Sequence, residues 1–382
     1  MADTVVGDTV GLGVIGGGLM GREIASAVAR WIHLDDLGVT PRLVHVCDVN
    51  PEVLRWYERL SPTPTLSTDY SELLADARVD AVYCAVPHHL HEQVYLDVLR
   101  AGKHLLAEKP FGIDLGAAQA VVAEVDARPE QLVRISSEFP FSPGGQAVWK
   151  WIADSSYGRL VEVRASFLHS SDLDPNKPIN WKRQAQFNGL YGCMGDLGMH
   201  ALHLPLRVGW FPSTVFALLS NVFSERPDGQ GGVTACDTWD NAVLACALAD
   251  GTPLIVETKR VAPGETNTWS IEIDGTDGSI AYSTKQPKTL RSLAYSPGLP
   301  QAWSSLDLGS VAAYPGITGA IFETGFSDWL QQMLAAYLDE LAHGAAGMRQ
   351  SFTCVTPAEA LDAHRIYTAA LESQATRSAV TL

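Results

Sequence analysis

An apolar run ends abruptly on two opposite charges and a proline in the stretch AGKHLLAEKP, residues 101–110. If the run is a buried strand of a parallel sheet, its carboxyl end opens onto the crevice where ligands bind. Lys109 would then put a cation beside a reacting carbon, Glu108 would balance that charge, and Pro110 would end the strand with a bond that can be cis. The alternative interpretation is a surface ion pair that caps the strand.

A second stretch, DLGMHALHLPL at residues 196–206, carries a carboxylate and two imidazoles at helical spacing. Asp196 and His200 are four residues apart, so on a helix they share a face, and His203 falls on that face one turn further. Oxidation of an alcohol needs a base for the hydroxyl proton as hydride leaves. Imidazole suits this role because its unperturbed pKa is near neutrality. We assign this role to His200.

The groups around the imidazole have roles in the same chemistry. Asp196 would orient the ring or bind a neighbouring hydroxyl, and Lys109 would disfavour the imidazolium in the free site and stabilise developing alkoxide charge. Two alternatives stay open: Asp196 caps the helix while both histidines pack in a core, or Asp196, His200 and His203 are metal ligands. Because no partner carboxylate or thiol is adjacent and hydride transfer needs no metal, we predict no metal site.

A glycine-rich loop near the N-terminus has the context of a dinucleotide-binding site. The sequence VGLGVIGGGLMGREIASAV reads as a strand, the loop, and then a helix. Gly16 allows the tight turn, Gly18 lets the main chain approach a pyrophosphate, and Gly21 permits close packing of helix on strand, with Leu19 and Met20 at the helix start. Free N–H groups at the helix N-terminus then favour the phosphates. The alternative is a glycine-rich turn without a ligand.

Asp48 ends the next strand-like run, RLVHVCD at residues 42–48. An acidic side chain there accepts hydrogen bonds from an adenosine ribose and repels a 2′-phosphate, so it favours NAD over NADP. Its distance from the glycines exceeds the usual ~20 residues, and the extra segment HLDDLGVTPR accounts for the difference. The alternative is a surface aspartate at a strand end.

A polar, proline-broken segment, SDLDPNKPINWKRQAQFNG, is locally cationic in an otherwise acidic chain. Trp181 could stack on an apolar sugar face, and Lys177, Lys182 and Arg183 could meet a carboxylate, sulfonate or phosphate group of a substrate. The same charges could equally be solvated on the surface.

The elements that must position these residues fall into two groups, which predicts two domains, residues 1–136 and 137–382. In the first, strand candidates alternate with helix candidates, which is typical of a doubly wound parallel sheet. In the second, longer strand candidates separated by Asp-Gly turns predict a mostly antiparallel sheet. The predicted strands are 9–15, 42–48, 79–86, 103–109 and 131–137, then 159–170, 213–224, 241–251, 252–261 and 269–283. The predicted helices are 22–32, 51–60, 91–102 and 115–126, then 327–343 and 357–372, with the C-terminal helix free to pack back on the first domain.

Composition narrows the class of protein. The chain has 382 residues, 46% of them hydrophobic, and a formal charge of −16, so it has no basic footprint for nucleic acid or anionic lipid. The N-terminus lacks the pattern of a signal peptide and no long apolar run is present, which predicts a cytoplasmic protein that does not bind membranes. The six cysteines are scattered and indicate reduced thiols.

Four motifs together resemble the glucose-fructose oxidoreductase / inositol dehydrogenase / MocA (Gfo/Idh/MocA) family: GVIGGGLMG, VDAVYCAVPHHLH, AGKHLLAEKP and GDLGMH. The resemblance implies an N-terminal Rossmann domain and a C-terminal α/β domain with a large open, mostly antiparallel sheet. It also implies NAD(P)-dependent chemistry on a ring hydroxyl of a sugar or cyclitol, and a homodimer or homotetramer that pairs through that sheet.

The resemblance also implies residue roles. Lys109 matches the lysine that contacts substrate and nicotinamide, and Asp196 and His200 match the Asp and His of the GDLGMH motif. The cofactor-contacting loop matches Val86, Pro87, His88 and His91. The chain departs from the family pattern at His88, where Asn is frequent, at His203, where Asp is typical, and in EFPFSPGG, which replaces an Asn-containing segment.

We therefore expect an NAD-dependent oxidoreductase that acts on a secondary ring hydroxyl, with Lys109, Asp196 and His200 as catalytic residues. Cofactor contacts are expected from the glycine loop, Asp48, residues 86–88, His91, Glu108 and Lys109, and substrate contacts from Lys109, residues 181–183, Asp196, His200 and His203. A second hypothesis is a glycosidase that uses NAD catalytically, by transient oxidation, elimination and re-reduction. A third is a catalytically silent NAD-binding regulator, which an intact Lys109 and His200 disfavour.

Overall fold

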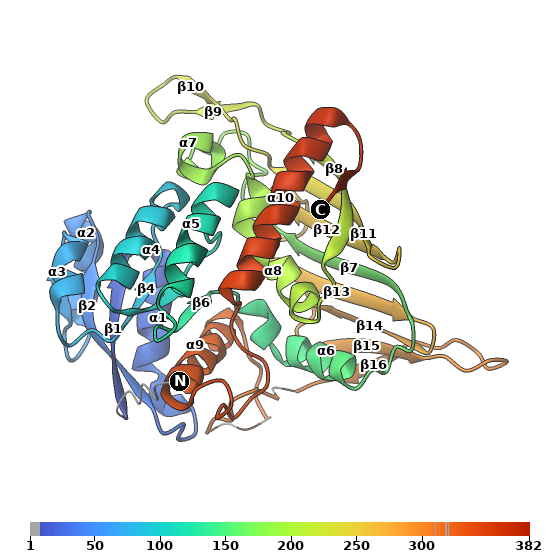
Figure 1. Ribbon diagram of the computed structural model, residues 1–382, viewed down its shortest axis with the longest axis horizontal. Coiled ribbons are helices and arrows are strands. Elements are labelled where there is room, and N and C mark those ends of the chain that lie inside the picture. The colour runs from blue at the N-terminus through green and yellow to red at the C-terminus, as the bar shows by residue number, and fades with distance from the viewer. Residues whose placement is uncertain (1–7, 310, 318, 320) are drawn as a thin grey trace.

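The computed structural model describes residues 8–309, 311–317, 319 and 321–382 of the chain. The start of the N-terminal segment that we interpreted as lacking a signal peptide, residues 1–7, lies outside the described residues. Two β-sheets stand side by side with helices between and around them (Figure 1). This arrangement confirms the predicted fold class, a parallel Rossmann sheet joined to a large, mostly antiparallel sheet.

The first sheet is parallel throughout and has the strand order β3-β2-β1-β4-β5-β6. Its strands are β1 (Thr9–Ile15), β2 (Thr40–Cys47), β3 (Thr65–Ser67), β4 (Ala81–Cys84), β5 (His104–Ala107) and β6 (Val133–Ile135). The strand order reverses between β1 and β4, and ligands bind outside the carboxyl ends of the strands at such a reversal. All five strands predicted for this region are present, and β3 is an additional short edge strand.

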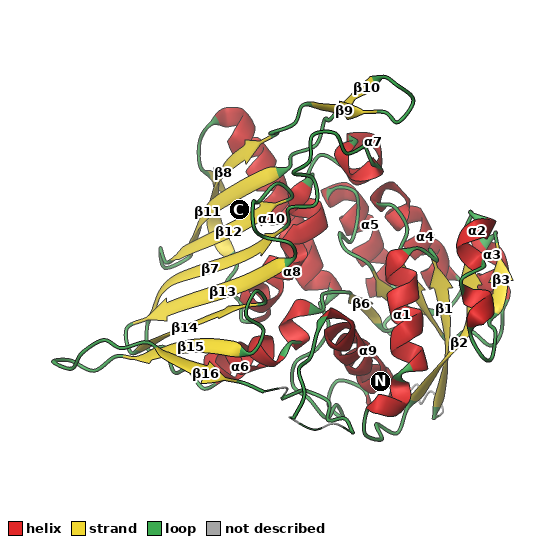
Figure 2. Ribbon diagram, turned by 180° about the vertical axis from the view of Figure 1, so that it is seen from behind, coloured by secondary structure: helices red, strands yellow, loops and turns green. Residues whose placement is uncertain are grey.

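Helices cover both faces of this sheet (Figures 1 and 2). They are α1 (Leu19–Ala29), α2 (Pro51–Leu54), α3 (Tyr70–Ala75), α4 (His91–Arg100) and α5 (Leu115–Asp126). A helix from the end of the chain, α9 (Phe326–His343), packs against α1. Gln331 of α9 donates hydrogen bonds to the backbone oxygens of Ala27 and Arg30, at 3.1 and 2.8 Å. The C-terminal region of the chain therefore packs on the outside of the helix layer of the first sheet through α9.

Glycine is required at Gly16, in the loop between β1 and α1, and at Gly21, in the first turn of α1. Gly16 has φ +96°, a conformation that side chains rarely adopt, and a Cβ atom there would lie 2.3 Å from the backbone oxygen of Ala85. A Cβ atom on Gly21 would lie 2.3 Å from the backbone oxygen of Gly16. The loop can therefore pass between β1 and β4 only because these two positions lack side chains.

The second sheet has nine strands in the order β16-β15-β14-β13-β7-β12-β11-β8-β17. They are β7 (Leu160–Leu168), β8 (Pro212–Ser220), β11 (Asn241–Leu248), β12 (Pro253–Lys259), β13 (Thr268–Gly275), β14 (Gly278–Ser283), β15 (Thr289–Ala294), β16 (Ser304–Asp307) and β17 (Val380–Thr381). Only β7 and β12 pair in parallel, and every other pair within this sheet is antiparallel. A separate hairpin, β9 (Glu225–Pro227) with β10 (Val233–Ala235), projects beyond it.

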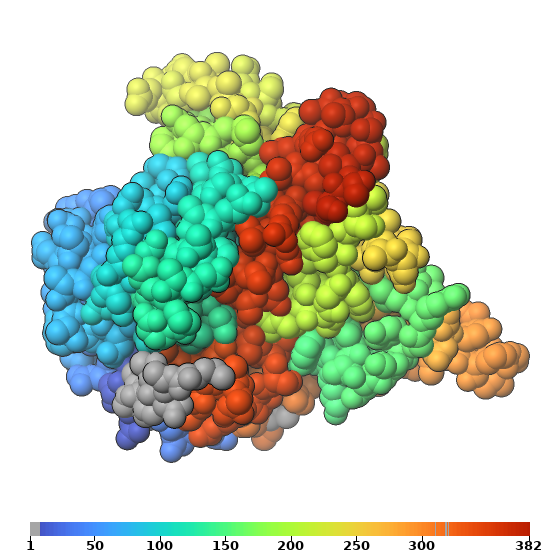
Figure 3. Space-filling view, in the orientation of Figure 1, coloured from blue at the N-terminus to red at the C-terminus, as the bar shows by residue number. Residues whose placement is uncertain are grey.

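Helices cover one face of the second sheet and leave the other face open (Figure 2). The covering helices are α6 (Pro143–Ala153), α8 (Cys193–Arg207) and α10 (Pro357–Thr376), while the four-residue α7 (Ala185–Asn188) contacts the turn His88–Leu90 that precedes α4. The strands alternate buried with more exposed residues, as expected for a sheet packed on one face only. On the surface, α10 runs between the two sheets (Figure 3). It contacts α5 of the first domain as well as α8 and β8 of the second.

All six cysteines are buried and unpaired. No helix within the described residues is long and apolar enough to cross a membrane. The same residues contain no group of three or more His, Cys, Asp or Glu side chains arranged to hold a metal ion.

Candidate active site

A cavity of about 660 Å³ lies between the two sheets. The carboxyl ends of β1, β4 and β5 form one wall, and α8 with the ends of β7 and β12 forms the opposite wall. Its charged and imidazole side chains belong to Glu23, His88, Glu108, Lys109, Glu138, His169, Lys182, Asp196, His200 and Arg260. The remaining lining is largely apolar or backbone, including Gly18, Leu19, Met20, Val86, Pro87, Phe139, Phe167, Trp181 and Phe326. The cavity therefore joins the strand ends expected to hold a dinucleotide to the Asp-His helix.

The glycine loop fits a dinucleotide. Gly18 precedes the first turn of α1 as its N-cap, and a Cβ atom placed there would meet nothing within 4 Å. No protein atom therefore requires glycine at this position, whereas Gly16 and Gly21 are required by the fold. The open space beside Gly18 and the free N–H groups of α1 form a cradle for a pyrophosphate. Gly16, Gly21 and Asp48 support this loop from outside the cavity lining.

Asp48 follows β2 and holds the glycine loop. Its Oδ2 atom accepts a 2.9 Å hydrogen bond from the backbone N–H of Gly17, and Oδ1 accepts one from Asn50. Its carboxylate lies beside the loop, as required of a residue that accepts hydrogen bonds from a ribose.

Lys109 bridges the two walls of the cavity. It follows β5, and the Lys109–Pro110 peptide bond is cis. Its Nζ atom lies 2.7 Å from the backbone oxygen of Asp196 and 3.2 Å from the Oδ1 atom of Asp196. Burial alone would lower the pKa of Lys109, but the carboxylates of Asp196, Glu108 and Glu138 hold it above its ordinary value. Lys109 is thus a permanent cation in the cavity.

Asp196 collects three cations although its side chain is almost completely buried. Lys109 and Lys182 both donate to Oδ1, the latter at 2.7 Å, and the guanidinium of Arg260 donates to Oδ2. Burial would raise the pKa of Asp196, but Lys109, Lys182 and Arg260 hold it well below the usual range. Arg260 in turn donates a 2.9 Å hydrogen bond to Asp172. Asp196 is therefore a carboxylate at all physiological pH values.

Trp181 and Lys182 line the same cavity. The Trp181 ring lies edge-on to His88, with ring centroids 4.8 Å apart, and the Lys182 ammonium lies 5.5 Å from its centroid. Burial is the main cause that lowers the pKa of Lys182 to about 8; Asp196 opposes it and the cations of Arg260 and Lys109 add to it. The aromatic surface and the crowded cations can contact the apolar face and the hydroxyls of a sugar.

His200 lies one turn after Asp196 on α8, as the sequence predicted. Its ring packs edge-on against Phe139 and Phe167, with ring centroids 5.1 and 5.0 Å apart. Its Nδ1 atom lies 3.3 Å from the hydroxyl of Ser137. Burial, followed by the nearby Lys109 cation, holds the pKa of His200 well below its ordinary value. The imidazole is therefore neutral at pH 7 and able to accept a proton.

Four of the charged and imidazole residues that line the cavity were missed by sequence reasoning: Glu23, Glu138, His169 and Arg260. Glu23 lies on α1, and the other three follow the carboxyl ends of β6, β7 and β12. Burial and then the carboxylate of Glu108 raise the pKa of Glu138 to about 7. Burial and then the cation of Arg260 lower the pKa of His169 to about 4. The signal that could have marked Glu138, His169 and Arg260 as candidates is the one that singled out Lys109, a polar residue at the carboxyl end of a predicted strand.

Two predicted substrate residues do not reach the cavity. Arg183 is completely buried, and its Nη2 atom lies 3.0 Å from the Oδ2 atom of Asp240. Successive side chains of the tight turn Trp181–Arg183 point in different directions, so Arg183 does not follow Trp181 and Lys182 into the cavity. His203 shares the helix face of His200, but the next turn of α8 is covered by the segment before α10, where its ring packs on Phe352 with centroids 4.8 Å apart.

Two other predicted residues lie at the edge of the site. His91 is buried beneath the cofactor loop, with its nitrogens 2.9 Å from the backbone oxygen of Val86 and 2.6 Å from that of Pro110. It therefore braces the 86–88 loop against the cis bond and does not line the cavity. Lys177 is bonded to Asp172 at 2.9 Å, outside the cavity lining.

Comparison with known proteins defines the class of this protein. Residues 10–135 match the Gfo/Idh/MocA "Oxidoreductase family, NAD-binding Rossmann fold", and residues 146–281 match the "GFO/IDH/MocA C-terminal domain". The chain belongs to the Gfo/Idh/MocA family. It is an oxidoreductase with NAD as its cofactor, and the predicted family, enzyme class and cofactor are confirmed.

Individual relatives match about three quarters of the chain in sequence, and a solved structure superimposes on nearly all of it. Levoglucosan dehydrogenase of Pseudarthrobacter phenanthrenivorans is 28% identical over 296 residues, which cover 73% of this chain and 75% of that protein. Inositol 2-dehydrogenase of Rhizobium meliloti is 25% identical over 284 residues, 74% of this chain and 78% of that protein. The structure of a levoglucosan dehydrogenase in complex with NADH superimposes with a TM-score of 0.87 at 24% identity, covering 98% and 99% of the two chains.

Proposed function

We propose that this protein is an NAD-dependent dehydrogenase that oxidises a secondary ring hydroxyl of a sugar, sugar derivative or cyclitol. The observation that carries the proposal is the convergence of Lys109, Asp196 and His200 on one cavity beside the glycine loop. The resemblance to dehydrogenases of levoglucosan and inositol supports the substrate class.

Each of the three side chains has a distinct task in this proposal. NAD, held beside the glycine loop, would supply the acceptor for the hydride of the carbinol carbon. His200, neutral because its pKa is held low, takes the hydroxyl proton. Lys109, held cationic by Asp196, stabilises the negative charge that develops on the oxygen. Asp196 fixes Lys109 and Lys182 on one oxygen atom, and it can accept a hydrogen bond from a neighbouring hydroxyl.

The remaining walls would select the substrate. Trp181 provides an apolar surface, and the half-buried Lys182 ammonium and the Arg260 guanidinium line the cavity next to Asp196. A polyhydroxylated ring presents an apolar face together with hydroxyls at its rim, which matches this combination.

NAD-dependent glycoside cleavage is the second candidate for the same site. Elimination after oxidation needs a second acid–base group, and Glu138, with a pKa raised to about 7, lines the cavity near His200. The two functions differ in stoichiometry. A dehydrogenase forms one NADH per ketone, whereas the glycosidase releases its aglycone without net NADH and exchanges a ring proton with solvent.

The experiment that tests the proposal combines binding and turnover. We expect the purified protein to bind NAD, as measured by calorimetry, and to form NADH with levoglucosan, myo-inositol or another member of a polyol and sugar panel. NADH and ketone should appear in equal amounts. Absence of NAD binding, or aglycone release without NADH, would contradict the dehydrogenase.

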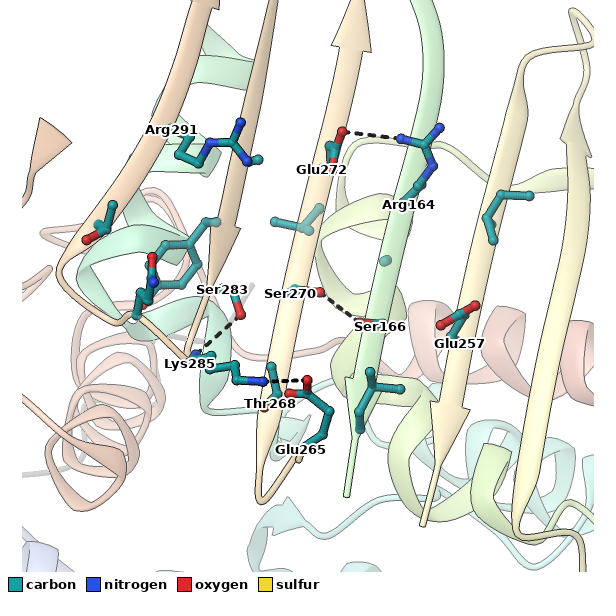
Figure 4. Close-up of a pocket in the computed structure, with 18 residues that line it drawn as sticks. Arg164, Ser166, Glu257, Glu265, Thr268, Ser270, Glu272, Ser283, Lys285 and Arg291 are labelled. Carbon is teal, nitrogen blue, oxygen red and sulfur yellow. Dashed lines mark hydrogen bonds and ion pairs between the residues drawn. The ribbon is translucent and has the colours of Figure 1, made fainter. Parts of the chain in front are cut away.

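We also propose that the open face of the nine-stranded sheet pairs with a second copy, giving a homodimer or homotetramer. Figure 4 shows the side chains of this face, including Arg164, Ser166, Ser270 and Glu272, pointing away from the covering helices. They surround a hollow of about 480 Å³. Light scattering should give a mass of two or four chains. Arg164→Glu, placed beside Glu272, should shift the measured mass toward that of the monomer, and an unchanged mass would contradict this interface.

A cytoplasmic location stays a prediction from the sequence.

A further inference from the structure

Ser137 and Glu138, the second and third residues after β6, reach the Nδ1 side of the His200 ring. The hydroxyl oxygen of Ser137 lies 3.3 Å and the Oε2 atom of Glu138 lies 3.9 Å from Nδ1. All three side chains are buried, with 0%, 4% and 3% of Ser137, Glu138 and His200 exposed. These contacts join the last strand of the first domain to the helix that carries the proposed base.

The main chain and the neighbouring rings fix the orientation of this imidazole. Trp269 donates a 2.8 Å hydrogen bond from its indole nitrogen to the backbone oxygen of His200. Phe139 and Phe167 pack edge-on against the ring at interplanar angles of 87° and 77°. Because these two adjacent rings pack against the imidazole and its main chain is hydrogen-bonded to Trp269, the fold restricts which groups can face Nδ1.

Which nitrogen carries the proton decides whether His200 can act as a base. A neutral imidazole has one N–H, so Nε2 is free to accept a proton only when Nδ1 keeps its own. Nδ1–H in turn needs an acceptor. A hydroxyl oxygen and a carboxylate are both acceptors, and a carboxylate also stabilises the positive charge of an imidazolium.

We propose that Glu138, assisted by Ser137, is a positioning residue that keeps the proton of His200 on Nδ1 and stabilises the imidazolium formed during turnover. The inference rests on the proposed role of His200 as base. In the step, the substrate O–H bond breaks and an N–H bond forms at Nε2, while the hydride leaves carbon with its electron pair for NAD. The Nδ1 proton stays on the ring and faces the Glu138 carboxylate, which offsets the new positive charge.

The charge on Glu138 depends on the groups that face it. Glu108 and Lys109 follow β5, Tyr83 lies on β4, and His200 lies on α8. Burial and the Glu108 carboxylate raise the pKa of Glu138 to about 7, and Lys109 acts in the opposite direction. His200 is itself faced by Lys109, Asp196, His169 and His203. Because the carboxylate form of Glu138 is lost as the pH falls through about 7, the stabilisation of the imidazolium is lost in the same range.

Nuclear magnetic resonance of the protein without ligands tests the tautomer directly. The ring nitrogens and carbons of selectively labelled histidine distinguish Nδ1–H from Nε2–H, and His200→Gln assigns the His200 signal. We expect Nδ1–H in the wild-type protein at pH 8 and in Ser137→Ala, and a shift of population toward Nε2–H in Glu138→Gln. His45, bonded to Asp76 and Ser67 in the first domain, is the internal control and should not change.

The outcomes decide the inference independently of turnover. An Nε2–H tautomer in the wild-type protein would overturn it, even if Glu138→Gln failed to fold. A His200 signal in Glu138→Gln identical to wild type would overturn it too, as would a change in Ser137→Ala alone. Since no sugar or NAD is present, absence of dehydrogenase activity would refute the proposed function and leave this result standing.

Kinetics provide a second readout that a purely structural role would not change. With NAD and levoglucosan as the probe, wild-type kcat should rise with pH through about 7, the pKa of Glu138. In Glu138→Gln at pH 8 we expect kcat to fall about tenfold or more, with the KM for the sugar little changed and the rise near pH 7 absent. Retention of that rise in Glu138→Gln would overturn the inference.

Discussion

The ammonium nitrogen of Lys109 lies 2.7 Å from the backbone oxygen of Asp196 and 3.2 Å from its Oδ1 atom. This contact joins the carboxyl end of β5 to the first turn of α8 and so links the two domains at the cavity. Because Asp196 also binds Lys182 and Arg260, the position of Lys109 is set by the second domain as much as by its own strand. Of the charged residues that end AGKHLLAEKP, Lys109 therefore connects the first sheet to the opposite wall of the cavity.

Replacement of this lysine should abolish catalysis more than binding. We expect Lys109→Met to lower kcat by roughly 10²–10⁴-fold, because a charge that stabilises the developing alkoxide is lost, with a much smaller effect on the Kd for NAD. The matched control is Lys103→Met at the opposite end of β5. Lys103 donates hydrogen bonds to the backbone oxygens of Asp76 and Val79. Its replacement should therefore lower the stability of the fold and leave kcat per folded molecule unchanged. Equal losses of kcat in both variants would contradict the assignment.

Replacement of Gly18 should weaken cofactor binding without destabilising the fold. A Cβ atom at this position meets no protein atom within 4 Å, so Gly18→Ala should leave the melting temperature nearly unchanged. The same atom would intrude where a pyrophosphate approaches the backbone, and we expect the Kd for NAD to rise about tenfold or more, or about 1.4 kcal/mol. Calorimetric titration measures it. Gly116→Ala on α5 is the control, since its Cβ would contact only Asp114, and its Kd for NAD should be that of the wild type. A wild-type Kd for NAD in Gly18→Ala would contradict the role of the glycine loop in binding the pyrophosphate.

The two histidines of α8 should behave differently although they are three residues apart. His200→Gln removes the proposed base, and we expect kcat to fall by about 10²–10⁴-fold. His203→Gln alters a ring packed on Phe352 outside the cavity, so its effect should be on the melting temperature, with kcat retained. Steady-state kinetics combined with thermal unfolding distinguishes the two. A larger loss of kcat in His203→Gln would mean that the wrong histidine was assigned.

His364 should make the fold sensitive to acid. Neither of its buried ring nitrogens has a hydrogen-bond partner within the described residues, and burial, with a small contribution from His91, lowers its pKa to about 3. The unfolded chain takes up a proton near pH 6.5, so the folded state loses stability as the pH falls from there toward 3.

Replacing that imidazole should flatten the pH dependence of stability. One proton taken up only by the unfolded chain lowers the free energy of unfolding by about 1.4 kcal/mol per pH unit. When the pH is lowered from 6.5 to 5.0, the free energy of unfolding of His364→Phe should therefore fall by about 2 kcal/mol less than that of the wild type. Urea titrations at the two pH values measure the difference. His364 packs edge-on against Tyr191, with centroids 5.5 Å apart, so an aromatic replacement keeps that contact. Parallel stability curves would show that His364 stays charged or exposed in the folded state.

Local patterns were sufficient to predict much of the fold and several residues that the structure brings together at the cavity. The glycine loop, Asp48, Lys109 and the Asp196–His200 pair depend on residue spacing within a single strand or helix, and such spacing survives folding. The strand-helix alternation of the first domain is similarly local. For this reason the parallel sheet and the cofactor loop could be predicted from the sequence.

The missed or misplaced residues depend on contacts between distant segments. His169 and Arg260 come together only because β7 and β12 pair in parallel inside an otherwise antiparallel sheet, a pairing that no local pattern indicates. Glu138 faces His200 across the domain boundary. Conversely, Arg183 and His203 had suitable residue types and spacing. Each contacts a residue from a distant segment instead of the cavity: Arg183 pairs with Asp240, and His203 packs on Phe352.

The most direct test of the central claim is transfer of deuterium from substrate carbon to NAD. Levoglucosan and myo-inositol deuterated at their ring carbons are incubated with the protein and NAD, and the NADH formed is analysed by mass spectrometry. We predict NADH carrying one deuterium, produced by the wild-type protein and His203→Gln and suppressed in Lys109→Met and His200→Gln. NADH without deuterium, or deuterium transfer that persists in both Lys109→Met and His200→Gln, would contradict the account.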